Sequence, residues 1–151
     1  KIFFCAGYNK GSMMMQLEQQ GEQIVPKILY ALKANVFGAD QQTPIFYQGY
    51  LYGVGADKEL ACLDTGGKIV WKSGKANKYG LGAYMIADGK IIVVNDDGIL
   101  SLIEAKSGGF NLITQAKVLD GHECWGPPAL VKGRLIVRDL TTMVCVDVAA
   151  Q

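Results

Sequence analysis

The feature that most constrains the fold is a pattern that recurs about every 40 residues along the 151-residue chain. Each copy holds an apolar run, a glycine turn, a second apolar run, a polar turn and a third run that closes on an acidic residue. The copies span residues 44–64, 84–104 and 128–147. The turn glycines are Gly49, Gly89 and Gly133, and the closing acids are Asp64, Glu104 and Asp147. A fixed period of this length indicates one structural unit used repeatedly.

Each copy reads as consecutive antiparallel strands. Apolar and polar positions alternate with a period of two, and the runs are bounded by short turn sequences such as "NDDG" at residues 95–98 and "SGG" at residues 107–109. Four antiparallel strands every 40 to 45 residues or so is the period of a β-propeller blade. The sequence therefore predicts an all-β partial propeller with about three blade-equivalents.

The start of the chain matches the repeat less well. A degraded copy ends at Glu18, which lies 46 residues before Asp64. Residues 26–35 could form a short helix with Pro26 in its first turn, but the repeat places a strand within residues 24–32, and we favour the strand. We expect the Met13–Met15 run to fill a blade interface rather than to form an adaptable binding surface.

These copies divide the chain into a single partial propeller with four parts. Residues 1–35 are expected to supply strands two to four of a first blade, residues 36–76 a second blade, residues 77–120 a third blade, and residues 121–151 a last blade without its fourth strand. A ring needs about four to eight blades. We therefore expect the sequence to be a fragment, the C-terminal part of a larger propeller whose natural N-terminus lies upstream.

Composition excludes several classes of protein. Half of the residues are hydrophobic and 19% are charged, which is typical of a folded domain. No apolar run approaches the roughly 18 residues of a membrane-spanning helix. The 15 basic residues nearly balance the 14 acidic ones and are scattered. A nucleic-acid partner would require a clustered basic surface, so we expect neither a nucleic-acid partner nor a membrane span.

The segment "CLDTGGKIVW", residues 62–71, resembles the tryptophan-docking repeat of the quinoprotein-like β-propellers, also called pyrroloquinoline quinone (PQQ)-like propellers. Asp64, Gly67, Lys68 and Trp71 match that repeat, one residue shorter than its usual spacing. The resemblance gives Asp64, Lys68 and Trp71 a structural role in docking neighbouring blades. The next copy, "IEAKSGGFN", has Phe110 or Asn111 where the tryptophan would stand.

The resemblance implies a bacterial PQQ-like repeat protein, located by family likeness in the periplasm or outside the cell. Similar proteins include PQQ-dependent alcohol dehydrogenases, a lipoprotein scaffold of outer-membrane assembly and secreted propellers of other kinds. We favour a non-catalytic binding or scaffold propeller with a protein or small-ligand partner at the channel face, which could also self-associate or pair with further N-terminal blades. The alternatives are a PQQ-dependent oxidoreductase and a polysaccharide-binding accessory domain.

An enzyme of that family would need a quinone, a carboxylate base, a calcium site and a disulfide between adjacent cysteines. The four cysteines of this chain lie far apart, and no acidic cluster has calcium-binding spacing. We therefore predict no cofactor, no metal site and no catalytic residue here. PQQ and calcium remain possible only through blades of a full-length parent.

Candidate ligand-binding residues lie in the loops that precede the first strand of each unit, because these loops surround the channel mouth of a propeller. The loops are residues 38–43, 77–82 and 120–128. The candidates are Gln41, Gln42, Lys78, Tyr79, His122, Glu123 and Trp125. The alternative for residues 120–128 is a catalytic site in which His122 is the base and Cys124 is the nucleophile. We favour a plain inter-blade loop in which Trp125 packs between blades.

The remaining reactive groups have structural explanations. Cys62 and Cys145 occupy the repeat position of Leu102, so we expect both to be buried, inert thiols. Cys5 lies in an apolar strand and is also expected in the core. Arg138 and Asp139 are expected to form a local ion pair in a turn.

Overall fold

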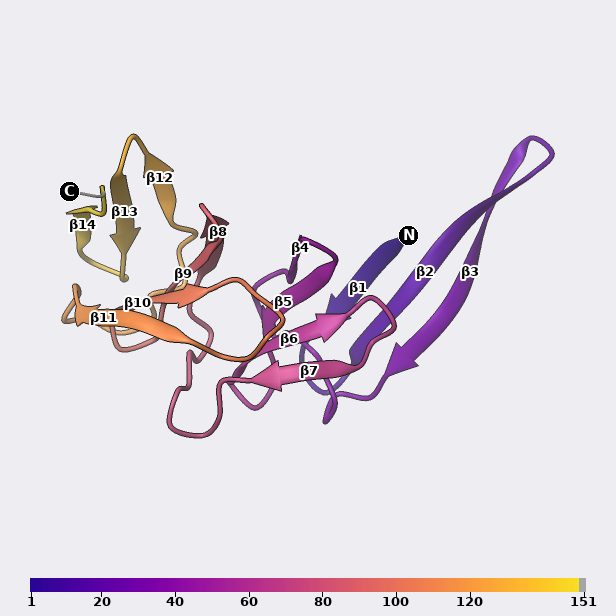
Figure 1. The fold of residues 1–151 in the computed structure, drawn as a ribbon, viewed down its shortest axis with the longest axis horizontal. Helices are drawn as coiled ribbons and strands as arrows, with labels where there is room; N and C mark the ends of the chain where they lie inside the picture. Colours follow the sequence, from indigo (N-terminus) through magenta and orange to yellow (C-terminus); the bar gives the residue numbers. More distant parts are fainter. Residues whose placement is uncertain (150–151) are drawn as a thin grey trace.

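The computed structural model describes residues 1–149, which form fourteen strands in four antiparallel sheets and contain no helix (Figure 1). In each sheet the strands follow one another in chain order. The all-β class predicted from the sequence is confirmed. No helix of the described chain could therefore span a membrane. Residues 150 and 151, at the end of the last predicted blade, lie outside the described residues.

The sheets take their strands from successive parts of the chain. The first sheet has β1 (Ile2–Ala6), β2 (Gly11–Gln20) and β3 (Gln23–Leu32). The second has β4 (Ile45–Tyr47), β5 (Tyr50–Val54), β6 (Leu60–Asp64) and β7 (Ile69–Lys72). The third has β8 (Tyr84–Ala87), β9 (Lys90–Val94), β10 (Ile99–Glu104) and β11 (Leu112–Lys117). The last has β12 (Ala129–Val131), β13 (Arg134–Arg138) and β14 (Met143–Asp147).

The recurring glycines mark two-residue hairpins. Gln48 and Gly49 have φ values of 47° and 87°, and the pairs at residues 88–89 and 132–133 have the same positive-φ geometry. Positive φ at both central residues defines the type I′ turn, whose twist matches that of the flanking strands. Glycine at the second position makes this backbone geometry accessible without strain.

The closing acids occupy equivalent positions in the strand pairing of three sheets. Asp64 pairs with Tyr50, and Glu104 and Asp147 take the same position against the first residue of β9 and β13. The carboxylate of Asp64 accepts hydrogen bonds of 2.9 Å from the backbone N–H groups of Gly66 and Lys68. The acid therefore fixes the turn that follows its strand.

Two details of the repeat prediction at the chain start are settled by the strand pairing. Residues 23–32 are strand β3, so the predicted strand is confirmed and the helix alternative is wrong. The alignment of Glu18 with Asp64 is wrong. Tyr30 pairs with Met14 as Trp71 pairs with Cys62, so Gln16, two residues beyond Met14, takes the position of Asp64. Glu18 lies farther along β2, which is ten residues long and runs with β3 beyond the rest of the sheet (Figure 1).

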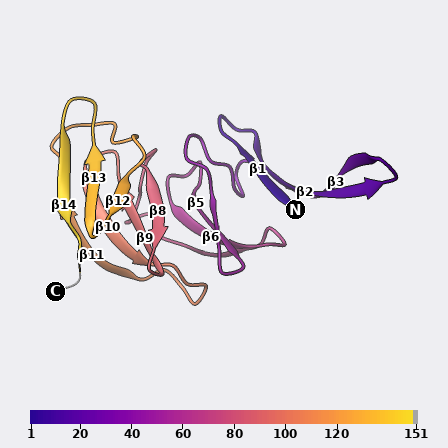
Figure 2. The same cartoon turned by 90° about the horizontal axis from the view of Figure 1, so that it is seen from above.

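The four sheets stand side by side along the molecule (Figure 2), and an apolar core lies at each junction. The first core contains Met14, Phe37 and Leu63, so the expectation that the methionine run fills an interface is confirmed for Met14. The second core contains Tyr52, Trp71 and Ile103 from the second and third sheets. The third core joins residues of β9 to residues of β13.

Trp71 belongs to one sheet and makes its polar contact with the next. Its Nε1–H donates a 2.8 Å hydrogen bond to the carbonyl oxygen of Lys106 in the β10–β11 turn. Its ring centroid lies 6.0 Å from that of Tyr52 and 5.9 Å from that of Phe110. The side chain is thus both packed and hydrogen-bonded, as a buried indole requires.

The third sheet has no aromatic residue at the corresponding position. Trp71 pairs with Cys62, and the residue that pairs with Leu102, the repeat partner of Cys62, is Thr114. The sequence-based placement of Phe110 or Asn111 at this position is therefore wrong. The reason is the turn between β10 and β11, which is longer than the turn between β6 and β7.

Tyr30 packs from the first sheet onto the second in a comparable way. A side chain at Gly67 would collide with the Tyr30 ring, so the glycine provides the surface on which the ring lies. Among the described residues the buried hydroxyl of Tyr30 has no hydrogen-bond partner. Burial, with a smaller contribution from Asp64, raises the pKa of this hydroxyl.

Replacing Tyr30 by phenylalanine should raise the free energy of unfolding by about 1 kcal/mol, because it removes a polar group whose desolvation is not compensated. The measurement is urea denaturation followed by tryptophan fluorescence. Tyr47→Phe is the control, since the Tyr47 hydroxyl accepts a hydrogen bond from Gln48. A loss of stability in Tyr30→Phe larger than that in the control would mean that the Tyr30 hydroxyl does make a stabilising hydrogen bond.

Cys145 is exposed, which corrects the expectation of a buried thiol, whereas Cys62 is buried as expected. Both cysteines project from the same face of their respective sheets. The third sheet covers that face of the second sheet, but no described element covers that face of the last sheet. Repeat position therefore predicts burial only where a following sheet is packed.

Candidate functional site

Three loops gather at one end of the stacked sheets. Because the strands of each sheet alternate in direction, the loops before β4, β8 and β12 lie at the same end as the β5–β6, β9–β10 and β13–β14 turns. We call this end the loop face. It contains the predicted loops at residues 38–43, 77–82 and 120–128.

Gln42 connects all three loops. Its Nε2 group donates a 3.2 Å hydrogen bond to the carbonyl oxygen of Trp125 and a 3.5 Å hydrogen bond to that of Leu81. The Tyr84 hydroxyl donates a 3.0 Å hydrogen bond to the carbonyl oxygen of Thr43 in the same loop. Residues 83 positions apart are therefore joined by one side-chain amide.

Asp96, in the β9–β10 turn, holds two of these loops. Its Oδ1 accepts 2.9 Å hydrogen bonds from the backbone N–H of Leu81 and from Nε1–H of Trp125. A side chain at Gly80 would collide with the Asp96 carboxylate, so glycine is needed for this close approach. Trp125 thus lies between the third and last units, and its indole N–H makes a polar contact with the third.

Asp139 repeats this arrangement in the last sheet. Its carboxylate accepts hydrogen bonds from the backbone N–H groups of Thr141, Thr142 and Gly121. The bonds from Thr141 and Thr142 contribute most to lowering the pKa of Asp139. The predicted ion pair with Arg138 is wrong, because Nη1 of Arg138 donates to the backbone carbonyl of Asp139 instead.

Asp40 anchors the loop nearest the first sheet. Its carboxylate lies 2.7 Å from Nζ of Lys58 and accepts a 3.1 Å hydrogen bond from the backbone N–H of Tyr8. The hydrogen bond from Lys58 is the main cause of the lowered pKa of Asp40. The loop face is therefore pinned by an acid at each of its three junctions: Asp40, Asp96 and Asp139.

The predicted ligand-binding residues differ in accessibility. Gln41, Lys78 and His122 are exposed, and Gln42, Glu123 and Trp125 are half-buried. Tyr79 is buried in the core between the second and third sheets. It cannot contact a ligand at the surface, and this corrects its assignment as a candidate. Its residue type and loop position do not reveal that the ring turns inward.

Sequence reasoning missed the acids that hold the loops. Asp40 lies within a predicted loop and Asp96 within a predicted turn, but neither is among the candidates, and Asp139 was predicted to pair with Arg138 rather than to hold a loop. The available signal was that the β9–β10 and β13–β14 turns each carry an aspartate while the loop before the sheet carries a glycine, at Gly80 and Gly121. Asp–glycine pairs in successive units suggest a recurring contact.

The loops leave little room between them. The cavity lined by Gln41, Gln42 and Leu81 has a volume of about 10 Å³, roughly the minimum for a single water molecule. A larger groove of about 530 Å³ lies between the third and last sheets, lined by residues such as Ile92, Leu102 and Leu130. None of the predicted ligand-binding residues lines that groove.

The residues of this chain do not fit a quinone with its calcium ion. Within residues 1–149, no three His, Cys, Asp or Glu side chains converge as a metal site. The four cysteines of the chain are unpaired and none is adjacent to another. The three anchoring carboxylates, those of Asp40, Asp96 and Asp139, are instead occupied by backbone N–H groups, by Trp125 and by Lys58.

Burial keeps the inner thiols neutral. It is the main reason that the pKa of Cys62 rises to about 11, from an ordinary value of 9.0. Burial also raises the pKa of Cys124 and of Cys5. These thiols therefore lack the lowered pKa that activates a nucleophilic cysteine.

Stability should fall as pH rises from about 9 to about 11. Over this range an unfolded Cys62 loses its proton while the folded one retains it, so the stabilising difference is full below pH 9 and disappears by about pH 11. Two pKa units correspond to a loss on the order of 2–3 kcal/mol. Thermal unfolding across this range should show a shallower decline for Cys62→Ala than for wild type. An equal decline with pH in the two proteins would mean that the raised pKa of Cys62 does not contribute to this loss of stability.

The comparisons with known proteins agree with this arrangement of sheets. No protein family and no curated protein matches the chain. Among solved structures, BamB from Moraxella catarrhalis is similar with a TM-score of 0.57 and 14% identity, over 79% of this chain and 34% of that chain. AztD from Citrobacter koseri is similar with a TM-score of 0.57 and 15% identity, over 96% of this chain and 43% of that chain.

A third similar structure is the quinohemoprotein alcohol dehydrogenase from Comamonas testosteroni, with a TM-score of 0.51 and 20% identity, over 64% of this chain and 16% of that chain. The chain thus spans less than half the length of each of these structures. All three are PQQ-like β-propeller repeat proteins. The chain has the β-propeller fold, and its structural neighbours are PQQ-like propellers, as the sequence resemblance implied.

Proposed function

We propose that the chain is a non-catalytic binding or scaffold propeller that holds a protein partner on its loop face. The observation that carries the proposal is the junction made by Gln42, which ties together three loops from three successive units. Such a junction gives a rigid surface, and preorganised surfaces lose little conformational entropy on binding.

The chemistry of this surface supports a macromolecular partner. Its accessible groups are of mixed character: the amide of Gln41, the ammonium of Lys78 and the imidazole of His122. The cavity between the loops is too small for an organic cofactor, which needs a pocket of roughly 300 Å³ or more. A surface without a deep pocket suits a protein that covers it.

We also propose that the protein acts outside the cytoplasm, either in the periplasm or in the extracellular space. This rests on the sequence resemblance to exported PQQ-like propellers and on the likeness to BamB and AztD. Fusion of the natural gene to a phosphatase that is active only after export tests this location.

The test of the loop face uses two matched double variants. Lys78→Ala with His122→Ala removes exposed side chains from the loop face, and Thr65→Ala with Lys68→Ala removes exposed side chains from the opposite end. We expect a partner captured by the wild-type chain to be retained by the second variant and lost by the first. Equal capture by both variants would overturn the loop-face assignment.

The wild-type chain and the loop-face variant also distinguish the scaffold from the two alternative functions, an oxidoreductase and a polysaccharide-binding domain. Stoichiometric uptake of PQQ with calcium, and dye reduction that depends on an alcohol, would support an oxidoreductase and overturn the scaffold proposal. Binding of a glycan that is lost in the loop-face variant, without any protein partner, would favour a polysaccharide-binding domain.

A further inference from the structure

Three Asp–Gly dipeptides lie in turns or loops of the chain, at residues 88–89, 97–98 and 120–121. In such a pair the backbone nitrogen of the glycine can attack the side-chain carboxyl carbon of the aspartate, because glycine carries no side chain that would block the approach. All three aspartates are exposed. Sequence and exposure therefore do not distinguish the three pairs, but their hydrogen bonds do.

The pair at residues 97–98 is held on both sides of its peptide bond. The N–H of Gly98 donates a 3.0 Å hydrogen bond to the carbonyl oxygen of Asn95. The carbonyl oxygen of Asp97 accepts a 2.7 Å hydrogen bond from Nζ of Lys117. Rotation of this peptide would break both bonds.

The pair at residues 120–121 is held by a buried acid. The N–H of Gly121 donates a 3.1 Å hydrogen bond to Oδ2 of Asp139, which is 3% exposed. A Cβ at Gly121 would collide with the same carboxylate, so the backbone lies tightly against it. The glycine nitrogen is therefore fixed in place here as well.

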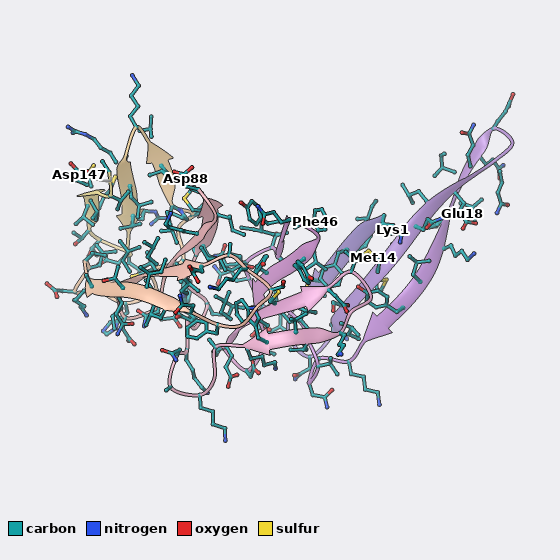
Figure 3. The ribbon with its side chains drawn as sticks, viewed as in Figure 1. Lys1, Met14, Glu18, Phe46, Asp88 and Asp147 are labelled. Atoms are coloured by element: carbon teal, nitrogen blue, oxygen red, sulfur yellow. The ribbon has the colours of Figure 1, made fainter. Side chains whose placement is uncertain are left out.

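The pair at residues 88–89 is different. It forms the tip of the β8–β9 hairpin, at the end opposite the loop face, and Asp88 is labelled there in Figure 3. Among residues 1–149 the N–H of Gly89 has no hydrogen-bond partner. The carbonyl oxygen of Asp88 accepts only an exposed 3.2 Å hydrogen bond from Nζ of Lys90. The central peptide of this turn is thus almost free of restraint.

The attack needs a rotation that this turn permits. Turning the central peptide converts a type I′ turn to type II′ and takes ψ of its first residue to about −120°. That ψ eclipses the glycine nitrogen with Cβ of Asp88, which is the arrangement a five-membered ring requires. Gly89 accepts either sign of φ.

The rest of the hairpin stays in place during the rotation. The bond from the N–H of Ala105 goes to the carbonyl oxygen of Gly89, which lies outside the rotating peptide. The pairing of Ala87 with Lys90 is outside it as well. Type II′ turns prefer glycine at the first position, so the rotated turn is a minor state and the reaction is slow.

We propose that residues 88–89 are a site of isoaspartate formation in the folded protein. The nitrogen of Gly89 bonds to Cγ of the protonated Asp88 carboxyl group, which loses one oxygen as water together with the proton of the nitrogen. Water then adds to the backbone carbonyl carbon of Asp88 in this cyclic imide and breaks its bond to the nitrogen. One water leaves and one enters, and nothing is oxidised or reduced.

The product changes both the backbone and the charge at the hairpin tip. The main chain now runs through Cβ and Cγ of residue 88, which adds one methylene, and the former backbone carbonyl becomes an α-carboxylate. This carboxylate is the substrate of methyltransferases that use S-adenosylmethionine and act on isoaspartate. The site would therefore take water as its reactant and such an enzyme as its partner.

The test is a tryptic map of the whole chain after weeks at neutral pH and physiological temperature. Cleavage after lysine places the three pairs in separate peptides, residues 79–90, 91–106 and 118–132. Mass spectrometry with electron-transfer fragmentation identifies isoaspartate in each. We expect at least about five times more in residues 79–90 than in either of the others, because each of the others must first break a hydrogen bond.

The matched variant is Asp88→Gln. The equivalent hairpin of the second sheet has Gln48 at this position with the same positive φ, so the variant should fold. A glutamine would have to form a six-membered ring, so we expect the modification to disappear from residues 79–90. Labelling by an isoaspartyl methyltransferase with S-adenosylmethionine should be lost from this peptide in parallel. The other two peptides should be unchanged.

The same incubation in urea shows whether the fold causes the preference. We expect the three pairs to react at similar rates in the unfolded chain, because their hydrogen bonds are then absent. The proposal would be overturned by folded protein in which residues 79–90 stay unmodified, or are modified no more than the other two peptides. An equal preference for residues 79–90 in urea would also overturn it, because the local sequence and not the hairpin would then be the cause.

Discussion

Replacing Trp71 by alanine should lower the free energy of unfolding by about 3–5 kcal/mol, the usual range for a buried tryptophan. The indole fills the junction between the second and third sheets and is 8% exposed. The variant also leaves the carbonyl oxygen of Lys106 without its hydrogen bond from the indole. Equilibrium urea denaturation followed by circular dichroism measures the loss.

Val70→Ala is the matched control for this variant. Val70 is the neighbouring residue in β7 and is 39% exposed, so its truncation should cost less than about 1 kcal/mol. A Trp71→Ala variant no less stable than Val70→Ala would mean that the indole does not join the two sheets. The inter-sheet packing described above would then be wrong.

Gly82→Ala should be the second most damaging change, with a loss of about 3 kcal/mol, at the upper end of the usual cost of overpacking. A Cβ at residue 82 would collide with the carbonyl oxygen of Val94, which is backbone and cannot rotate away. The loop would have to move from the end of β9, where the N–H of Val94 bonds to the carbonyl oxygen of Ala83. Thermal unfolding gives the size of the effect.

The displacement should also reach the loop face. Leu81 precedes the altered residue, and its backbone groups bond to Gln42 and Asp96. We therefore expect Gly82→Ala to weaken partner binding as well as folding. Gly108→Ala is the control, because a Cβ at residue 108 meets nothing within 4 Å and the residue does not have positive φ. Equal stability of the two variants would mean that residue 82 does not lie close to the carbonyl oxygen of Val94.

The repeat made most of the fold predictable from the sequence. Gly49, Gly89 and Gly133 were recognised as turn positions because type I′ hairpins restrict both central residues, and each of these glycines has positive φ. The period also placed Asp64 in register with Glu104. Local turn chemistry repeated at a fixed spacing is information that a single sequence carries.

The misplaced details depended on lengths and neighbours that the pattern does not encode. Glu18 was misaligned because β2 and β3 are longer than their counterparts, and Thr114 was overlooked because one turn is longer than its equivalent. Cys145 was expected to be buried from its repeat position, but burial depends on a sheet packed against it. These are properties of the junctions, and the hydrophobic pattern within one unit does not specify them.

The candidate site was predicted only in part. The loops were identified because those before the first strand of each unit surround the channel mouth of a propeller, and they do converge through Gln42. The inward turn of Tyr79 and the anchoring roles of Asp40, Asp96 and Asp139 follow from tertiary contacts between units. Spacing along the chain does not reveal such contacts.

The most direct test of the account is a nuclear Overhauser measurement between loops of different units. The central claim is that the successive units pack as propeller blades and bring their loops together at one face. The account predicts cross-peaks from the side-chain amide protons of Gln42 to protons of both Leu81 and Trp125, whose carbonyl oxygens lie 3.5 Å and 3.2 Å from its Nε2. Amide protons of Gln42 that show contacts only within their own loop would contradict it.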